Sequence, residues 1–274
     1  MMAATSRGIH RLEVARPWVF DDPLALVMVG PAWPEIRAEM AAAFGEDLLR
    51  TTAAMLLVRS RFAETRLDAG RFAQYVLLGA GLDSFAWRRP DRLAAGLRLF
   101  EVDHPDSQAW KRARVEQLGL PLHGNHVFAP VDFEVETFDA GLDRVGFDWS
   151  APTFFSWLGV VPYLTVDAVA STLQTLAKAG SGSEVVLSYC VPRSEMCETG
   201  LRFDDVLVGL LDSVGEPFHT VLRAAEMEAL VERCGLTVVE HPDRATVAAR
   251  YFAGRTDGLG PIVFEQSLAA RIGG

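Results

Sequence analysis

The sequence is poor in cysteine, in basic residues and in long apolar runs, and each shortage excludes a class of protein. Its three cysteines, Cys190, Cys197 and Cys234, lack a close metal-binding spacing, and their odd number favours reduced thiols over a disulfide framework. A formal net charge of −10 argues against a surface for nucleic acid or anionic membranes. No run approaches the roughly 18 apolar residues that span a bilayer, and residues 1–10 lack the apolar core of a signal peptide. We therefore expect a soluble, cytoplasmic protein.

Repeats, low-complexity tracts and long linkers are also absent, so we expect residues 1–274 to form one domain. Half of the residues are hydrophobic and 23% are charged, which is an ordinary globular composition. Apolar, strand-like runs alternate with helical patterns, and this alternation predicts an α/β fold with a doubly wound, mostly parallel sheet. The expected parts are a helical N-terminal extension at 1–70, a ligand-binding core at 71–190, an insertion at 191–222 and the rest of the core at 223–274.

The expected elements follow from apolar periodicity and from turn residues. A helical pattern at 34–67 breaks at Gly45, and a second helix begins at Thr165 as its N-cap. The opening stretch contains Arg16-Pro17-Trp18 and Phe20-Asp21-Asp22-Pro23, and we expect it to pack over the domain without regular structure. Strands are predicted at the six apolar runs 75–78, 97–103, 127–131, 154–157, 184–189 and 236–240.

The clearest motif is the first of these strands with the glycines that follow it. Residues 75–78, Tyr-Val-Leu-Leu, lead directly into Gly79-Ala80-Gly81. A continuous apolar run suits a strand buried on both faces, and glycines allow a sharp turn with close approach of a ligand. No third glycine completes the dinucleotide fingerprint, which argues against a nicotinamide-dependent oxidoreductase.

The second strand ends in acids, about 20 residues after the glycines, at Glu101-Val-Asp103. At that spacing a carboxylate holds the ribose of a nucleotide in α/β folds, because it accepts two hydroxyl hydrogen bonds at once. The alternative is a solvated acid at a strand end. Together with the glycine turn, Asp103 predicts a site for a nucleotide-like ligand.

Two segments and one lysine resemble the leucine carboxyl methyltransferase-like family. They are Val-Leu-Leu-Gly-Ala-Gly-Leu-Asp-Ser at 76–84, Glu-Val-Asp-His-Pro at 101–105, and Lys111 beyond them. Members of this family are S-adenosylmethionine-dependent O-methyltransferases, including polyketide carboxyl methyltransferases of the tetracenomycin type. The resemblance extends from about Arg59 to the segment near Gly258. It implies a Rossmann-like class I methyltransferase fold, S-adenosyl-L-methionine as the cofactor, and methyl transfer to a small molecule.

The resemblance also implies the residues that bind the cofactor. Gly79, Ala80 and Gly81 would lie against it, Asp103 would hold its ribose, and Asp83 would steady the turn or reach the cofactor through water.

Further residues would contact the adenine and the carboxylate of the cofactor, and other roles remain open for them. Asp132 is either a turn cap or, as in the family, the acceptor for the adenine amino group, with the backbone of Phe133 completing the contact. Arg59 matches the arginine that pairs with the cofactor's carboxylate, and Arg61 is the second choice. On the residues alone, a surface salt bridge to Glu64 is the simpler prediction.

One position departs from the family. Many relatives have Glu-Gly where this chain has Leu158-Gly159. Leu158 cannot supply the charge that meets the cofactor near its amino group, so backbone carbonyls are the expected replacement. This departure motivates an alternative hypothesis, in which the protein binds the cofactor without transferring a methyl group.

No base for catalysis is evident. His219 is a weak candidate and Tyr163 could orient an acceptor oxygen, whereas His104, a further candidate, is expected to be a turn residue. A carboxylate acceptor, with a pKa near 4, is ionised at pH 7 and needs no base, so a carboxylate is the favoured acceptor. The pair His123 and His126 has no nearby Cys or acidic partner, and no metal site is expected. No Gly-x-Ser-x-Gly motif supports a serine hydrolase.

The insertion at 191–222 is expected to cover the substrate site, because it lies after the fifth strand. Asp204, Val206, Leu207, Leu210 and Leu211 predict a lid helix that presents apolar residues to the acceptor or fills a gap beside the core. The sequence leaves the identity of the acceptor and the oligomeric state open.

Overall fold

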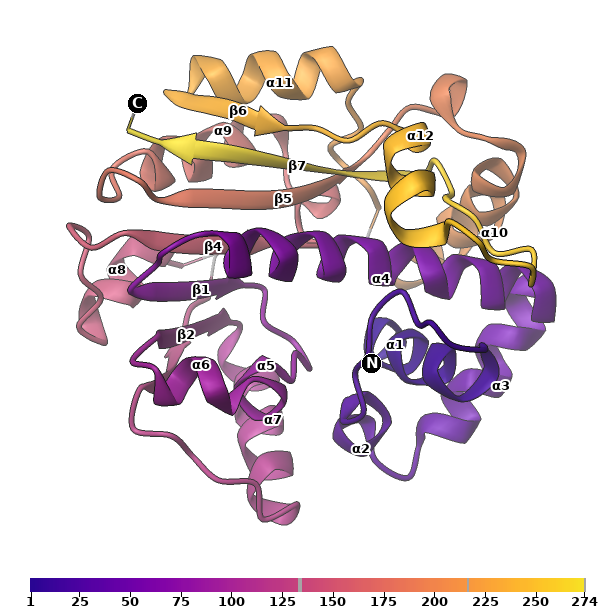
Figure 1. The fold of residues 1–274 in the computed structure, drawn as a ribbon, viewed down its shortest axis with the longest axis horizontal. Helices are drawn as coiled ribbons and strands as arrows, with labels where there is room; N and C mark the ends of the chain where they lie inside the picture. The colour runs from indigo at the N-terminus through magenta and orange to yellow at the C-terminus, as the bar shows by residue number, and fades with distance from the viewer. Residues whose placement is uncertain (133–134, 216, 274) are drawn as a thin grey trace.

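The structure is a computed structural model that describes residues 1–132, 135–215 and 217–273. Within these residues, seven strands form one sheet in the order β3-β2-β1-β4-β5-β7-β6 (Figure 1). The strands are β1 Gln74–Leu78, β2 Arg98–Asp103, β3 His126–Pro130, β4 Thr153–Trp157, β5 Glu184–Cys190, β6 Leu236–Glu240 and β7 Glu265–Ile272. Neighbours among β1 to β5 pair in parallel, and β7 is antiparallel to both β5 and β6. The prediction of a mostly parallel, doubly wound sheet is confirmed.

Strands β1 to β6 lie where the apolar runs predicted them. Every residue of β1, β4 and β5 is buried, which explains their nearly continuous apolar sequences. The seventh strand, β7, was not predicted. Its Ala269 and Ala270 have low strand propensity, but β7 pairs with β5 on one side and β6 on the other. Ladder hydrogen bonds on both sides and the burial of its centre outweigh local propensity.

Helices cover both faces of the sheet. Their bounds are α1 Met2–Glu13, α2 Ala25–Val29, α3 Trp33–Phe44, α4 Glu46–Ala69, α5 Phe85–Arg88, α6 Pro90–Ala94, α7 Pro105–Gln117, α8 Phe138–Arg144, α9 Val166–Leu176, α10 Glu198–Val214, α11 Ala224–Arg233 and α12 Arg244–Val247. One apolar core joins α8, α9 and α11 to the sheet, and a second joins α4, α5 and α6 to its other face. The Thr165 hydroxyl caps α9 by accepting a hydrogen bond from the Ala168 N–H, as predicted.

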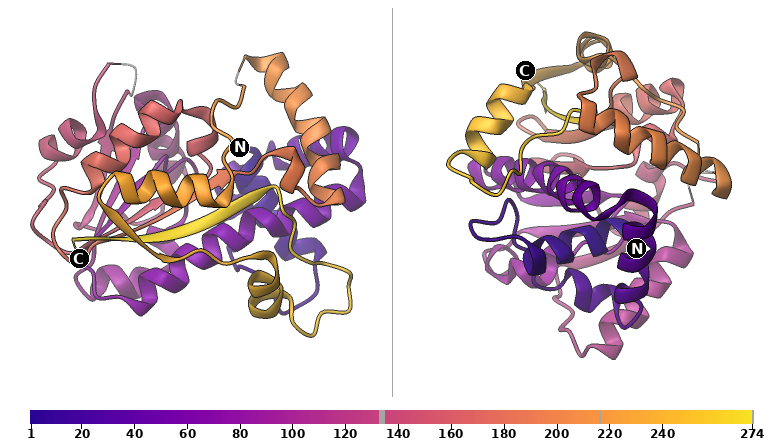
Figure 2. Two further views of the ribbon diagram at one scale, coloured as in Figure 1. Left: turned by 90° about the horizontal axis from the view of Figure 1, so that it is seen from above. Right: turned by 90° about the vertical axis from the view of Figure 1, so that its right-hand side faces the viewer.

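The N-terminal part forms more regular structure than expected. The helical pattern at 34–67 is confirmed as α3 and α4, with Gly45 between them. The opening stretch is irregular only at residues 14–24, because residues 2–13 form α1. A third apolar core joins α1, α3, α4 and α10. These helices lie at the carboxyl ends of the parallel strands (Figure 2, right), so both the N-terminal extension and the insertion cover the edge where ligands bind in such folds.

The described part of the chain contains no helix that combines the length and the hydrophobicity needed to cross a bilayer. The helix expected within the insertion is present as α10.

His10 ties α1 to the irregular segment and makes the packing of α1 sensitive to acid. Its Nε2 accepts a hydrogen bond from the Val19 N–H at 3.2 Å, so the ring is neutral. Burial, followed by the nearby Arg255, lowers the pKa of His10 to about 4. Since the unfolded chain has a pKa near 6.5, the stabilisation is complete above pH 6.5 and is lost as the pH falls towards 4. The expected loss of unfolding free energy is about 3 kcal/mol.

This pH dependence can be measured by urea denaturation between pH 7 and pH 4. His10→Gln keeps an acceptor for Val19 and removes the titrating group, so its unfolding free energy should fall less than that of the unmodified protein. The exposed His219, changed to Gln, is the control and should leave the profile unchanged. Equal profiles for His10→Gln and the unmodified protein would contradict the role of His10.

Candidate functional site

The glycine turn after β1 is fixed against the neighbouring strands. The N–H groups of Gly79 and Ala80 both donate to the Val102 carbonyl, at 2.9 and 3.1 Å. Gly79 has a φ of +75°, and a Cβ at this position would lie 2.4 Å from the Val160 side chain. Gly81 has a φ of +46°, and a Cβ there would meet no atom within 4 Å. The turn is therefore packed at Gly79 and open at Gly81, where a ligand can approach the backbone.

The acids that follow β2 and β3 lie beside this turn. Asp103 accepts hydrogen bonds from the N–H groups of Gly81 and His104, at 2.5 and 2.7 Å. Val131 N–H donates to the Asp103 carbonyl at 2.9 Å, which places Asp132 at the next strand end. His104 Nε2 lies 4.0 Å from Asp132 Oδ2, between the two acids. The structure thus brings Asp103 and Asp132 together with the glycines, whereas Phe133 lies outside the described residues.

Two other residues of the motif have structural partners. Asp83 accepts a hydrogen bond from the Phe85 N–H at 2.7 Å and so holds the start of α5. His104 accepts from the Asp106 N–H at the start of α7, as expected of a turn residue. His126 Nε2 is 3.0 Å from Glu101 Oε1, so it belongs to a buried ion cluster.

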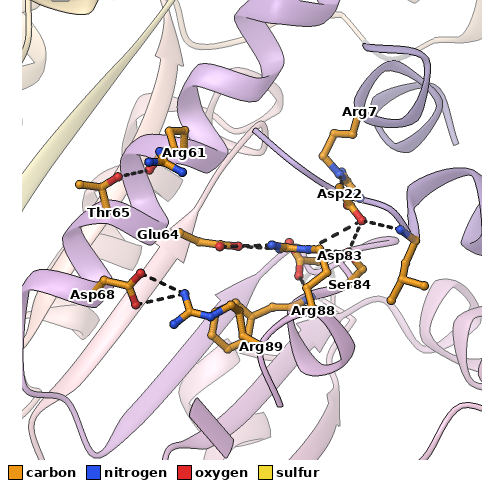
Figure 3. A network of polar contacts seen from close by, with 12 residues as sticks. Arg7, Asp22, Arg61, Glu64, Thr65, Asp68, Asp83, Ser84, Arg88 and Arg89 are labelled. Carbon is orange, nitrogen blue, oxygen red and sulfur yellow. Dashed lines mark hydrogen bonds and ion pairs between the residues drawn. The ribbon is translucent and has the colours of Figure 1, made fainter. Parts of the chain in front are cut away.

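Arg59 belongs to α4, and its side chain lies at the carboxyl end of β4. Its Nη1 donates to both oxygens of Glu265, at 2.8 and 2.9 Å. Its guanidinium lies over Gly159, where a Cβ would come within 2.7 Å of it. The predicted surface salt bridge to Glu64 is wrong, because Glu64 pairs with Arg88 instead. Arg61 is on the exposed side of α4 and borders a surface groove beside Glu64 (Figure 3). Arg59 is therefore the arginine that faces the site.

A polar network fastens α1 to the glycine turn (Figure 3). Arg7 donates to the Leu82 carbonyl at 2.7 Å and to Asp22 at 2.9 Å. Asp22 also accepts from the Ser84 hydroxyl at 2.7 Å, and Ser84 accepts from Arg88 at 2.8 Å. Burial raises the pKa of Asp22, but Arg7 and Arg88 outweigh it and hold the net pKa below its usual range. The N-terminal helix is thus connected by ionic contacts to the residues that follow Gly81.

A cavity of about 420 Å³ lies between these N-terminal helices, α10 and the strand ends. Apolar side chains dominate its wall, and Arg59, Glu265, Tyr163 and Cys190 are the only ionisable side chains among its described lining residues. The other lining residues are Met2, Ala3, Ser6, Met40, Phe44, Leu49, Thr52, Met55, Leu56, Gly159, Pro162, Phe203, Leu207, Leu210, Leu211, Phe218 and Phe264. Burial, followed by Glu265, raises the pKa of the Cys190 thiol well above its usual value, so the thiol stays neutral.

A smaller cavity of about 230 Å³ lies on the other side of the Gly79–Val160 contact. Its wall includes Glu136 and Phe138, which follow Asp132 in the chain, and Trp157 at the end of β4. Gly79 and Val160 thus line the smaller cavity, whereas Arg59 and Gly159 line the larger, apolar one.

The two candidate catalytic residues differ in position. Tyr163 lines the large cavity, and its ring packs against Phe218 at 5.3 Å between centroids. His219 is exposed and borders a shallow surface hollow with Tyr163, and it is not among the described residues that line the large cavity.

No pattern in the sequence predicted a role for Glu265. This residue begins β7, and that strand has no clear apolar alternation. Only the order of the strands, with β7 beside β5, brings Glu265 to Cys190 and to Arg59.

Comparisons with known proteins agree on the family. The leucine carboxyl methyltransferase family pattern matches residues 1–177. YktD of Bacillus subtilis, a candidate S-adenosyl-L-methionine-dependent methyltransferase, is 35% identical over 188 residues, which are 68% of this chain and 61% of that protein. A similar candidate from Frankia alni is 33% identical over 199 residues, which cover 68% of each protein.

Solved structures share the fold. A DUF574 protein from Streptomyces avermitilis has a TM-score of 0.61 at 17% identity, covering 98% of this chain and 97% of that one. A candidate methyltransferase from Thermobifida fusca has a TM-score of 0.58 at 17% identity, covering 90% and 92%. With its Rossmann-like class I sheet and its S-adenosylmethionine-dependent relatives, the chain belongs to the leucine carboxyl methyltransferase family.

Proposed function

We propose that the protein methylates a small, largely apolar molecule at an oxygen, with a carboxylate as the favoured acceptor and S-adenosyl-L-methionine as the methyl donor. The observation that carries this proposal is the 420 Å³ apolar cavity that reaches Gly159 and Arg59 at the carboxyl end of β4. A cavity of this size suits a small-molecule acceptor.

The residues around the glycine turn fit the cofactor. Asp103 offers a carboxylate for the ribose, Asp132 one for adenine, and Gly79, Ala80 and Gly81 a backbone without bulky side chains. Arg59 offers donors for a carboxylate on the opposite side. The adenosine end would thus lie towards the smaller cavity and the methionine end towards the larger one.

When bound, S-adenosylmethionine supplies a sulfonium methyl group, whose carbon bonds to the acceptor oxygen while the electrons of the carbon–sulfur bond return to sulfur. The protein has to align the two partners and exclude water, and alignment supplies most of the rate. An ionised carboxylate needs no proton removed. Glu265 in the cavity wall is paired with Arg59, and the described lining residues include no histidine, lysine or aspartate that could remove a proton, which supports an acceptor of this kind.

The direct test incubates the protein with S-adenosylmethionine carrying a labelled methyl group and a panel of small apolar carboxylic acids and phenols. Label in a base-labile ester supports carboxylate methylation, and label in an ether shifts the acceptor to a hydroxyl.

Leu158 favours a second candidate function, because it packs against the apolar core of the α4 face rather than offering a charge. Binding of S-adenosylhomocysteine without transfer to any acceptor would support that cofactor-binding function.

The role of the lid helix can be tested with neighbouring residues of α10. Leu207 lines the large cavity, whereas Val208 is exposed on the same helix. Leu207→Trp should fill the acceptor space and raise the KM for the acceptor at least about 10-fold, with little change in S-adenosylhomocysteine affinity. Val208→Trp is the matched control and should change neither. Equal KM values for the Leu207→Trp variant and the unmodified protein would place the acceptor elsewhere.

A further inference from the structure

The ion pair between Arg59 and Glu265 is unusual because both side chains line a cavity rather than lying on the protein surface. The side chains are only 16% and 5% exposed, and both line the large apolar cavity. Taking two charges out of water is costly, and a buried ion pair is weak evidence for stability. A stabilising role alone therefore does not explain an ion pair in this cavity wall.

The pair also has unused hydrogen-bonding capacity. Arg59 contacts both Glu265 oxygens through Nη1 alone, and the described contacts leave its Nε and Nη2 without a hydrogen bond. Each oxygen of Glu265 has a second lone pair. Arg59 can thus donate a hydrogen bond to an anion while Glu265 accepts one from a cation, and the ion pair between them stays intact.

A ligand that satisfies both charges carries a carboxylate and an ammonium group close together, as a free α-amino acid does. The methionine end of S-adenosylmethionine is such a group. The pair lies over Gly159, which follows β4, and the neighbouring Val160 contacts Gly79 of the glycine turn. The charges are therefore next to the turn on which the cofactor is placed.

We propose that Glu265 binds the ammonium group of the cofactor's methionine end while Arg59 binds its carboxylate. This inference rests on the proposed placement of the cofactor. A carboxylate from β7 then provides the charge that Leu158 does not, and backbone carbonyls are no longer needed as its replacement. Glu265 becomes a determinant of specificity, because ligands without the ammonium group leave its charge unsatisfied.

The test is titration calorimetry on the unmodified protein and on Glu265→Gln with three ligands. S-adenosylhomocysteine has the whole amino-acid end, its deaminated analogue lacks only the amino group, and 5′-methylthioadenosine lacks the amino-acid end. Glu265→Gln should bind S-adenosylhomocysteine at least about 10-fold more weakly, because a charged hydrogen bond is lost. Its affinity for 5′-methylthioadenosine should stay within about twofold. The unmodified protein should bind the deaminated analogue about 10-fold or more weakly than S-adenosylhomocysteine, whereas the variant should bind the two ligands with almost equal affinity.

Glu184→Gln is a matched control. Glu184 also forms a two-pronged contact with an arginine, Arg66, at 2.7 Å, and its side chain is 6% exposed. It lies at the amino end of β5, away from the cavity. Thermal unfolding should show destabilisation in both variants, but only Glu265→Gln should lose affinity for S-adenosylhomocysteine.

Four outcomes would overturn the inference, and they are distinguishable. Unchanged S-adenosylhomocysteine binding by Glu265→Gln removes Glu265 from the site and leaves the cofactor placement intact. Unchanged binding with a fall in kcat alone would make Glu265 a base for the acceptor. Equal losses for S-adenosylhomocysteine and 5′-methylthioadenosine would make the pair a structural link between α4 and β7. If the unmodified protein binds none of the three ligands, the proposed cofactor placement itself fails.

Discussion

Replacing Lys111 with methionine should lower the free energy of unfolding by about 3–5 kcal/mol, because it leaves a buried carboxylate without its main counter-charge. Lys111 Nζ lies 2.5 Å from Glu101 Oε2, and both side chains are 1% exposed. Burial raises the pKa of Glu101, but Lys111 and His126 outweigh it and hold the net pKa below its usual range. The carboxylate is therefore ionised at neutral pH and depends on these partners. Urea denaturation at pH 7 measures the loss.

Two controls isolate the effect of the unpaired charge. Lys178→Met removes the other lysine of the chain, which is mostly exposed and only 3.8 Å from Asp139, and should cost less than about 1 kcal/mol. The double variant Glu101→Gln, Lys111→Met removes both charges and should recover much of the stability lost in Lys111→Met. A loss of under 1 kcal/mol for Lys111→Met would show that the contact contributes little.

Replacing Asp103 with alanine should weaken the binding of S-adenosylhomocysteine by more than about tenfold, because the two hydrogen bonds that we propose to the ribose hydroxyls would be lost. The change also removes the acceptor of the Gly81 N–H, so the open side of the turn loses its support. Titration calorimetry gives the affinity, and a thermal unfolding curve shows whether the fold is kept.

Asp106→Ala is the nearby control, since Asp106 is exposed at the start of α7, and its affinity should match that of the unmodified protein. NAD should bind to neither variant nor to the unmodified protein, because the turn lacks the third glycine of a dinucleotide site. Equal S-adenosylhomocysteine affinities for Asp103→Ala and the unmodified protein would refute the ribose assignment.

The parts of the site that the sequence predicts are those fixed by neighbours in the chain. Gly79, Gly81 and Asp103 follow strands whose apolar runs identify them, and parallel pairing then brings the strand ends to one edge. Thr165 and Gly45 act within one turn of their own helices. Such features depend on local conformation, which a short window of residues encodes.

Glu265 was not predicted because its role depends on contacts between distant segments. Its partner Arg59 is 206 residues away in the chain, and its strand gains its stability from pairing with β5 and β6. The partner predicted for Glu64 was also wrong, because Glu64 pairs with Arg88 rather than with an arginine of its own helix. Which of several arginines reaches a given acid is decided by packing, and periodicity carries no information about it.

The position of β7 also has a consequence for the order of folding. Residues 265–272 come after β6 in the chain, yet they lie between β5 and β6 in the finished sheet (Figure 1). β6 therefore cannot join the sheet until β7 has been synthesised, and contacts of such long range form slowly. Until β7 pairs with β5, the edge of β5 is exposed in the nascent chain. Such an unpaired edge is prone to aggregation. The pairing of β7 then completes both the sheet and the Arg59–Glu265 contact, so a chain truncated before residue 265 would lack both.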